Sequence, residues 1–129
     1  KALRDEGTSY HYVPHGDFSH PNEKLKNKFG KFINKQGLKY EEGATWTIDS
    51  FYRETKEEVK KYKKLGIATV EMETSALFAV AGLRKVKIAS AFVVSDTLFG
   101  SKQIRLTHKQ DFKINIRKLL DAGVECLRK

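Results

Sequence analysis

The sequence has one cysteine, two prolines and no long apolar run. Its single cysteine, Cys126, cannot form an internal disulfide, which is typical of proteins in a reducing compartment, so we expect a cytoplasmic location. No apolar run approaches the roughly 18 residues that a membrane-spanning helix needs, so we expect no membrane partner. With 40% hydrophobic residues in 129, the chain can bury a sizeable core, and we expect a single domain over residues 1–129.

Positive charge is in excess, and the formal net charge is +9. Lysine supplies 19 of the 25 basic residues, and these lysines are spread along expected helices instead of alternating with aromatic residues. Solvated, lysine-rich helix faces explain this pattern more simply than a nucleic-acid surface does, so we do not expect a nucleic-acid partner. Cys126 lies near an apolar helix face and is expected to be a small core residue, not a nucleophile.

A pair of acids stands where an apolar run becomes a helix, in the segment Thr69–Ala76. Glu71 and Glu73 alternate along an extended segment, so their side chains should point the same way and that of Met72 the other way. After them, apolar residues recur at helical spacing to about residue 84. Glu73 is then either an ordinary acid of a helix N-terminus or a functional carboxylate, and its position alone favours the first alternative.

A second apolar run, at residues 86–94, predicts a buried strand that ends at Ser95 and Asp96. Strand, helix and strand over roughly 30 residues match the size of a βαβ unit. If the two strands are parallel, Glu73 and Asp96 lie at their carboxyl ends, where open α/β sheets bind ligands. We therefore expect these two acids to converge on one pocket.

Elsewhere we expect a helix over residues 23–36, capped by Asn22, and a strand over 38–48. A short helix should start from the capping box at 55–58, and a strand should follow over 67–71. A last helix should run from the capping box at 107–110 to about residue 127. Residues 1–21 are expected to be a loop. Three of the four histidines lie in it, but their spacings of four and five residues do not match a zinc site, so we expect no metal. Phe51, in a polar loop, is either a core residue or a ring that stacks on a flat ligand.

The run VEMETSALFAVA, followed by VVSD, resembles the signature of the nucleoside phosphorylase family of purine nucleoside phosphorylases, uridine phosphorylases and methylthioadenosine-cleaving enzymes. Arg4–Tyr10 is similar to the segment that follows the family's phosphate-binding loop, and Thr47–Tyr52 to its base-stacking loop. The four segments stand in the family's order and spacing. The resemblance implies a three-layer αβα fold with a mixed sheet flanked by helices.

The resemblance also implies roles on the ribose side of a site. Glu73 would accept hydrogen bonds from the ribose 2′ and 3′ hydroxyls, Met72 would pack against the sugar, and Glu71 would help to shape the ribose site. Phe51 would cover the base. Cleavage of an N-glycosidic bond builds positive charge on the sugar, and a fixed carboxylate stabilises that charge without reorganising.

On the base side, the resemblance implies that Asp96 faces the purine N7 and that Ser95 orients it. A departing base leaves more easily when protonated, and burial at the end of an apolar strand favours the protonated form of a carboxyl group. Arg105 is the nearest candidate for the arginine that supports proton transfer in bacterial purine phosphorylases.

The activity that this resemblance implies is phosphate-dependent cleavage of a nucleoside to free base and ribose 1-phosphate. It needs no cofactor, because inorganic phosphate is the co-substrate, and we expect a homo-oligomer. Thr55 and Glu57 stand where uridine phosphorylases carry a glutamine and an arginine, which favours purines. A uridine phosphorylase, a nucleosidase that uses water, and a non-catalytic nucleoside-binding module remain alternatives.

The family's phosphate-binding glycine loop and arginines precede the equivalent of residue 1, and Arg4 is a poor substitute for them. We therefore expect the sequence to be the C-terminal portion of a nucleoside phosphorylase-like fold that holds the ribose and base half of the site. By itself, this chain should have little or no phosphorolytic activity. A sheet without its N-terminal strands should also have an open edge that associates with another chain.

Overall fold

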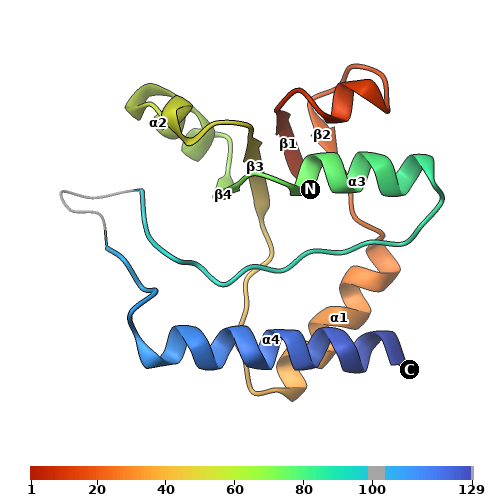
Figure 1. Ribbon diagram of the computed structural model, residues 1–129, viewed down its shortest axis with the longest axis vertical. Coiled ribbons are helices and arrows are strands. Elements are labelled where there is room, and N and C mark those ends of the chain that lie inside the picture. The colour runs from red at the N-terminus through yellow and green to blue at the C-terminus, as the bar shows by residue number, and fades with distance from the viewer. Residues whose placement is uncertain (99–103, 129) are drawn as a thin grey trace. The chain divides into compact units, whose positions relative to one another are not determined.

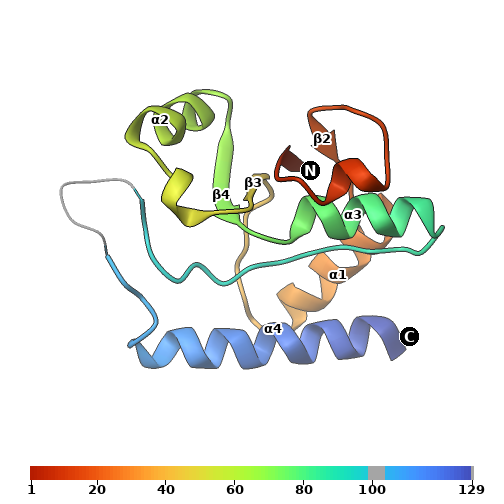
Figure 2. The same ribbon diagram turned by 45° about the horizontal axis from the view of Figure 1, so that its top comes forward.

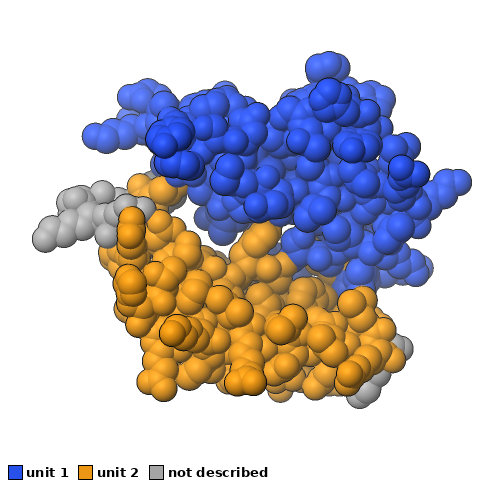
Figure 3. Space-filling model, viewed as in Figure 1, with its two compact units in different colours: residues 1–25, 42–90 blue, residues 26–41, 91–129 orange. Residues whose placement is uncertain are grey.

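The computed structural model describes residues 1–98 and 104–128. The chain forms two compact units, coloured blue and orange in Figure 3. Unit 1 comprises residues 1–25 and 42–90, and unit 2 comprises residues 26–41 and 91–129. The expectation of a single domain stays a prediction.

Unit 1 is built on a mixed four-stranded sheet with the strand order β2-β1-β3-β4 (Figure 1). The strands are β1 (Ala2–Asp5), β2 (Phe18–Ser19), β3 (Ala44–Ile48) and β4 (Ile67–Glu71). Strand β3 is parallel to both β1 and β4, and β2 is antiparallel to β1. The carboxyl ends of three parallel strands therefore lie at one edge of the sheet.

Alternate residues of β3 face two different helices. Trp46 and Ile48 are buried, and Val59 and Tyr62 of α2 (Lys56–Lys64) pack against their cluster. On the other face, the Thr47 hydroxyl accepts a hydrogen bond from a backbone N–H of α3 (Thr74–Leu83). Helix α2 also contacts β4, and α3 contacts the other three strands (Figure 2). The sheet thus lies between two helices.

Unit 2 consists mainly of α4 (Gln110–Arg128) and most of α1 (Glu23–Lys35). Asn22 caps α1, because its side-chain oxygen accepts the Leu25 N–H at 2.9 Å. Cys126 is buried with 2% exposure, as expected for a small core residue. Within unit 2, apolar side chains line an open groove: Phe29, Ala91, Phe92, Val93, Ile116, Leu119, Leu120, Gly123, Val124 and Leu127.

The strand at 67–71 is confirmed with the same ends, and the predicted helices at 23–36, 55–65, 73–84 and 107–127 are confirmed with ends that shift by at most three residues. The predicted strand at 38–48 is shorter, because only Ala44–Ile48 pairs with neighbours. None of the helices in the described residues is long and apolar enough to cross a membrane.

Two predictions about the sheet are wrong. Residues 86–95 form no strand, so no βαβ unit joins Glu73 to Asp96. Instead Ile88 accepts a backbone hydrogen bond from Asn22, and residues 91–93 line the groove beside α4. Residues 1–21 are not only a loop, because they contain β1 and β2. The expected burial is wrong as well, because none of residues 86–94 is buried and Val86 is 62% exposed. An apolar run alone specifies neither a partner nor a strand, and a strand of mixed polarity gives a weak periodic signal.

Candidate active site

The carboxyl edge of the sheet in unit 1 holds four of the predicted site residues. Glu71 is the last residue of β4, opposite Thr47 of β3. Met72 and Glu73 follow Glu71, and Phe51 follows the end of the neighbouring strand β3. Parallel topology therefore places the predicted ribose segment and the predicted base-stacking segment at one edge, where α/β sheets bind ligands.

Glu71 is the most highly connected of these residues. One carboxylate oxygen accepts the backbone N–H groups of Glu73 at 2.9 Å and Thr74 at 2.6 Å. The other accepts the hydroxyls of Thr47 and, at 3.3 Å, Thr45. Glu71 therefore satisfies the free N–H groups at the start of α3 and ties that start to β3.

Glu73 occupies the N-cap position of α3, but its φ of −131° and ψ of −32° lie outside the extended region usual for an N-cap, and its side chain makes no cap hydrogen bond. The extended segment predicted for both acids ends at Glu71, so the expected common direction of Glu71 and Glu73 does not follow. The Glu73 carboxylate is exposed and accepts the Met72 N–H at 3.2 Å, and Met72 is itself 46% exposed. An exposed carboxylate beside an exposed thioether can receive a polar ligand with an apolar face.

A buried chain of polar residues supports this segment, and none of its residues is among the predicted site residues. Glu6 is 6% exposed and accepts the Ser75 hydroxyl at 2.6 Å and the Ser9 N–H at 2.9 Å. The Ser75 N–H reaches Thr47 at 2.9 Å. Burial raises the pKa of Glu6, but hydrogen bonds from Ser75 and Ser9 together lower it by more. The net pKa therefore lies below its ordinary value of 4.5.

Arg4 belongs to the same buried region. Its guanidinium donates to the Ser9 hydroxyl at 2.9 Å and to the carbonyls of Pro14 and Val13 at 2.8 and 3.4 Å. It also lies over the Tyr10 ring, 4.3 Å from the ring centre. These internal contacts, with only 6% exposure, mean that Arg4 is not presented to a phosphate.

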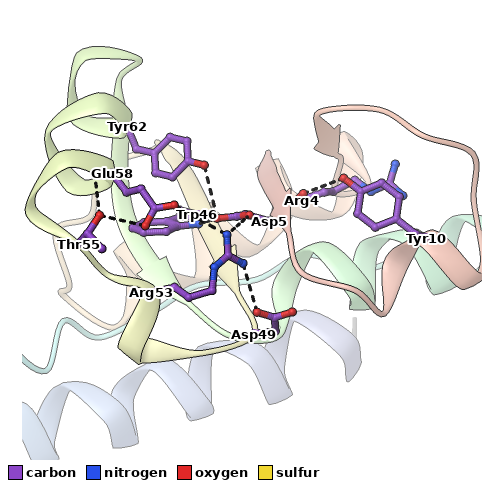
Figure 4. A network of polar contacts seen from close by, with 9 residues as sticks. All are labelled: Arg4, Asp5, Tyr10, Trp46, Asp49, Arg53, Thr55, Glu58 and Tyr62. Atoms are coloured by element: carbon purple, nitrogen blue, oxygen red, sulfur yellow. Dashed lines mark hydrogen bonds and ion pairs between the residues drawn. The ribbon is translucent and has the colours of Figure 1, made fainter.

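Phe51 lies in the short 3-10 turn Phe51–Arg53 after β3. Its side chain is 59% exposed, which excludes the core alternative, and its ring centre is 4.0 Å from that of Tyr52. Arg53 of the same turn forms an ion pair with Asp5 at 3.0 Å (Figure 4). The turn therefore presents an aromatic surface while a charged residue holds it to β1.

The predicted base residues lie in unit 2. The Ser95 hydroxyl donates to Asp96 at 2.8 Å. Asp96 and Arg105 are directly opposite in an antiparallel bridge. The flanking backbone hydrogen bonds are Leu106 N–H to Ser95 O at 2.6 Å and Thr97 N–H to Ile104 O at 3.1 Å. Asp96 and Arg105 are thus a non-hydrogen-bonded pair, in which side chains lie on one face and close together.

The sequence therefore identified two groups of neighbours: Glu71, Met72, Glu73 and Phe51 in unit 1, and Ser95, Asp96 and Arg105 in unit 2. Their convergence on one nucleoside, and the role of each residue there, stay predictions. Among residues 1–98 and 104–128, no group of three histidine, cysteine, aspartate or glutamate side chains could hold a metal ion.

Curated relatives match part of the chain. A purine nucleoside phosphorylase of the DeoD type from a strain of Bacillus cereus is 36% identical over 92 residues, which is 70% of this chain and 39% of that protein. A protein of the same name from Bacillus thuringiensis (strain Al Hakam) matches with the same identity and coverage. The aligned region thus spans well under half the length of these relatives.

Three solved structures share the fold. An AMP nucleosidase from Bacteroides thetaiotaomicron VPI-5482 has a TM-score of 0.70 and 22% identity, and the match covers 99% of this chain and 53% of that chain. A P knowlesi homolog of P falciparum PNP has a TM-score of 0.73 and 16% identity, with 97% of this chain and 49% of that chain covered. A uridine phosphorylase from Vibrio fischeri ES114 has a TM-score of 0.62 and 24% identity, with the same two coverages of 97% and 49%. The chain spans about half of each. The predicted α/β class, with a mixed sheet in a three-layer phosphorylase-like fold, is confirmed. A sequence model of the Phosphorylase superfamily matches residues 1–128, and the chain belongs to that superfamily.

Proposed function

We propose that this chain carries the ribose and base half of a purine-directed nucleoside phosphorylase site. The reaction is phosphate-dependent cleavage of the N-glycosidic bond to free base and ribose 1-phosphate, with inorganic phosphate as co-substrate and no cofactor. The observation that carries the proposal is the exposed side-chain carboxylate of Glu73. The backbone N–H of the same residue donates to Glu71 and so fixes its position. The DeoD-type purine nucleoside phosphorylases, at 36% identity, support the same reaction class.

Glu73 would bind the ribose. An ionised carboxylate accepts two hydroxyl hydrogen bonds, and its negative charge stabilises the positive charge that develops on the sugar as the bond breaks. Because Glu71 already satisfies the start of α3, Glu73 does not lose hydrogen bonds within the helix when it turns to a ligand. Met72 and Phe51 would supply apolar contacts to the sugar and the base.

Asp96 would protonate the purine at N7 as the base departs. The Ser95 hydroxyl, which donates to Asp96 at 2.8 Å, would fix the orientation of the carboxyl group. Arg105, opposite Asp96 in the bridge, would stabilise the carboxylate that remains after proton transfer.

The residues around the base-stacking turn favour a purine over uracil. Thr55 is the N-cap of α2, where its hydroxyl accepts the Glu58 N–H at 3.2 Å and donates to the Glu58 carboxylate at 3.1 Å. Glu57 has no donor when ionised. Arg53 is engaged by Asp5, Asp49 and Glu58. Donors for uracil carbonyl groups are therefore not supplied by these positions.

Calorimetric titration of the 129-residue chain with inosine, adenosine and uridine tests the binding half of the proposal. We expect the two purine nucleosides to bind more tightly than uridine, and Glu73→Gln to weaken inosine binding about tenfold or more, because a charged acceptor is lost. Tighter uridine binding would favour a uridine phosphorylase, and no binding of any nucleoside would refute the proposal.

Base release with and without phosphate tests the reaction. Release that needs phosphate supports a phosphorylase, whereas release in its absence identifies a nucleosidase that uses water. Nucleoside binding without release by any longer form that contains residues 1–129 would indicate a binding module. We expect the 129-residue chain alone to release little base. Arg4 is buried, and the described site has no other candidate residue for binding phosphate.

A further inference from the structure

One arginine connects the turn that carries Phe51 to three other elements of unit 1. Arg53 forms ion pairs with Asp5 at the end of β1 (3.0 Å), with Asp49 just after β3 (3.4 Å) and with Glu58 in α2 (3.8 Å), as Figure 4 shows. Its hydrogen bond to Asp5 and the negative charge of that residue raise the pKa of Arg53 above its ordinary value. The guanidinium is therefore occupied by protein carboxylates.

Asp5 is a fixed partner for Arg53. Its side chain is 21% exposed and also accepts the Trp46 indole N–H at 2.9 Å and the Tyr62 hydroxyl at 3.4 Å. Trp46 is 2% exposed and belongs to the core cluster. An ion pair with a partner already held by the core loses less side-chain entropy than a pair between two mobile side chains. Arg53 is thus anchored to the core through Asp5.

Apolar burial does not hold this turn. None of its three residues is buried, and the neighbouring ring of Tyr52 is 83% exposed. Within the turn, the backbone hydrogen bonds are local: Arg53 N–H to Ser50 O at 3.0 Å and Glu54 N–H to Phe51 O at 3.1 Å. The position of the Phe51 ring therefore depends strongly on the charged anchor two residues further along the chain.

We propose that Arg53 is a positioning residue, which holds the turn Phe51–Arg53 so that the Phe51 ring is ready to cover the base of a bound nucleoside. This inference rests on the proposed function. Arg53 acts through Phe51 and does not contact the base, because its donors are directed to acids of the sheet and of α2. Holding the ring before the ligand arrives reduces the entropy that binding must overcome.

Hydrogen exchange tests the anchoring without any ligand. In Arg53→Ala, we expect faster exchange of the amides of residues 53–55 and unchanged exchange in β4, which lies in the same sheet. Lys60→Ala is the matched control, because it removes the same charge from an exposed position of α2. Arg53→Lys keeps the charge but loses the planar fork, and it should restore part of the protection. Unchanged exchange in Arg53→Ala would overturn the proposal.

A double-mutant cycle tests whether Arg53 acts through Phe51. We expect Arg53→Ala to weaken inosine binding about fivefold in the natural chain, at the upper end for exposed ion pairs. In the Phe51→Ala background it should have no further effect. An equal loss in both backgrounds would show a role independent of Phe51 and overturn the proposal. If the natural chain binds no nucleoside, the proposed function and the base-covering role both fail, whereas the exchange data still decide whether Arg53 anchors the turn.

Discussion

Glu71 accepts the backbone N–H of Glu73 at 2.9 Å, so the acid that ends β4 holds the acid that begins α3. From its position alone, Glu73 is predicted to be the acid of the helix N-terminus, and the family resemblance makes it the ribose-binding acid. In the structure, the carboxylate that satisfies the first N–H groups of α3 is that of Glu71, which also binds Thr47 of the neighbouring strand. One acid thus has a structural role, and the other is exposed to solvent and ligands.

This division predicts unequal effects on stability. Glu71→Ala leaves two backbone N–H groups and the Thr47 hydroxyl without their acceptor, and we expect it to lower the free energy of unfolding by about 1–2 kcal/mol or more. Glu73→Ala removes an exposed side chain that makes no cap, and it should change that free energy by less than about 0.5 kcal/mol. Urea unfolding of both variants checks this. Equal losses would contradict the division.

The proton-donor role of Asp96 predicts a substrate-dependent loss of activity. In a form of the protein that turns over nucleosides, Asp96→Asn should slow cleavage of purine nucleosides about 10²- to 10⁴-fold, because an amide cannot deliver the proton. Nucleosides of 7-deazapurines lack the N7 acceptor and serve as the control, since the natural protein and the variant should cleave them equally slowly. Undiminished cleavage of inosine by Asp96→Asn would reject the role.

Glu6 predicts a specific loss of stability in acid. Its pKa is lowered in the folded chain, so the folded state favours the ionised form. The resulting stabilisation is present above the ordinary value of 4.5 and is lost as the pH falls through the lower folded value. Urea unfolding between about pH 6 and pH 3 should therefore show a smaller loss of stability in Glu6→Gln than in the natural chain. A loss that is the same in both would exclude a contribution from Glu6.

Local signals explain which parts of the fold the sequence could predict. Asn22 and Thr55 accept helix N–H groups as their positions predicted, and Gly37 and Gly66 have positive φ values next to the ends of α1 and α2. Each of these features depends on residues within one helical turn. The hydrophobic spacing of residues 73–84 is equally local.

The errors concern partners that are distant in the sequence. The polar residues of β1 gave no strand signal, because their contacts are made by residues outside that strand. Asp5 accepts the Trp46 indole N–H, and Arg4 donates to the Pro14 carbonyl in the loop before β2. The apolar run at 86–94 predicted a buried strand, whereas none of its residues is buried and residues 91–93 line an open groove together with residues of α4. The buried chain from Glu6 through Ser75 to Thr47 also joins residues up to 69 positions apart, and a single sequence holds no signal for it.

The turn between α2 and β4 gives a prediction that depends on backbone conformation alone. Gly66 has φ +76°, and a Cβ atom added to it would meet no atom within 4 Å, so a substitution there introduces no clash. Gly66→Ala should still destabilise the chain by about 1 kcal/mol, because a side chain disfavours the left-handed region.

Gly82, inside α3, also has open space around it, and its φ is not positive. There alanine favours the helix, so Gly82→Ala should stabilise the chain by about 0.5–1 kcal/mol. Thermal and urea unfolding of the two variants should therefore shift in opposite directions. Stabilisation by Gly66→Ala would mean that the conformation of Gly66 is not the one described, and destabilisation by Gly82→Ala would contradict the helical role of Gly82.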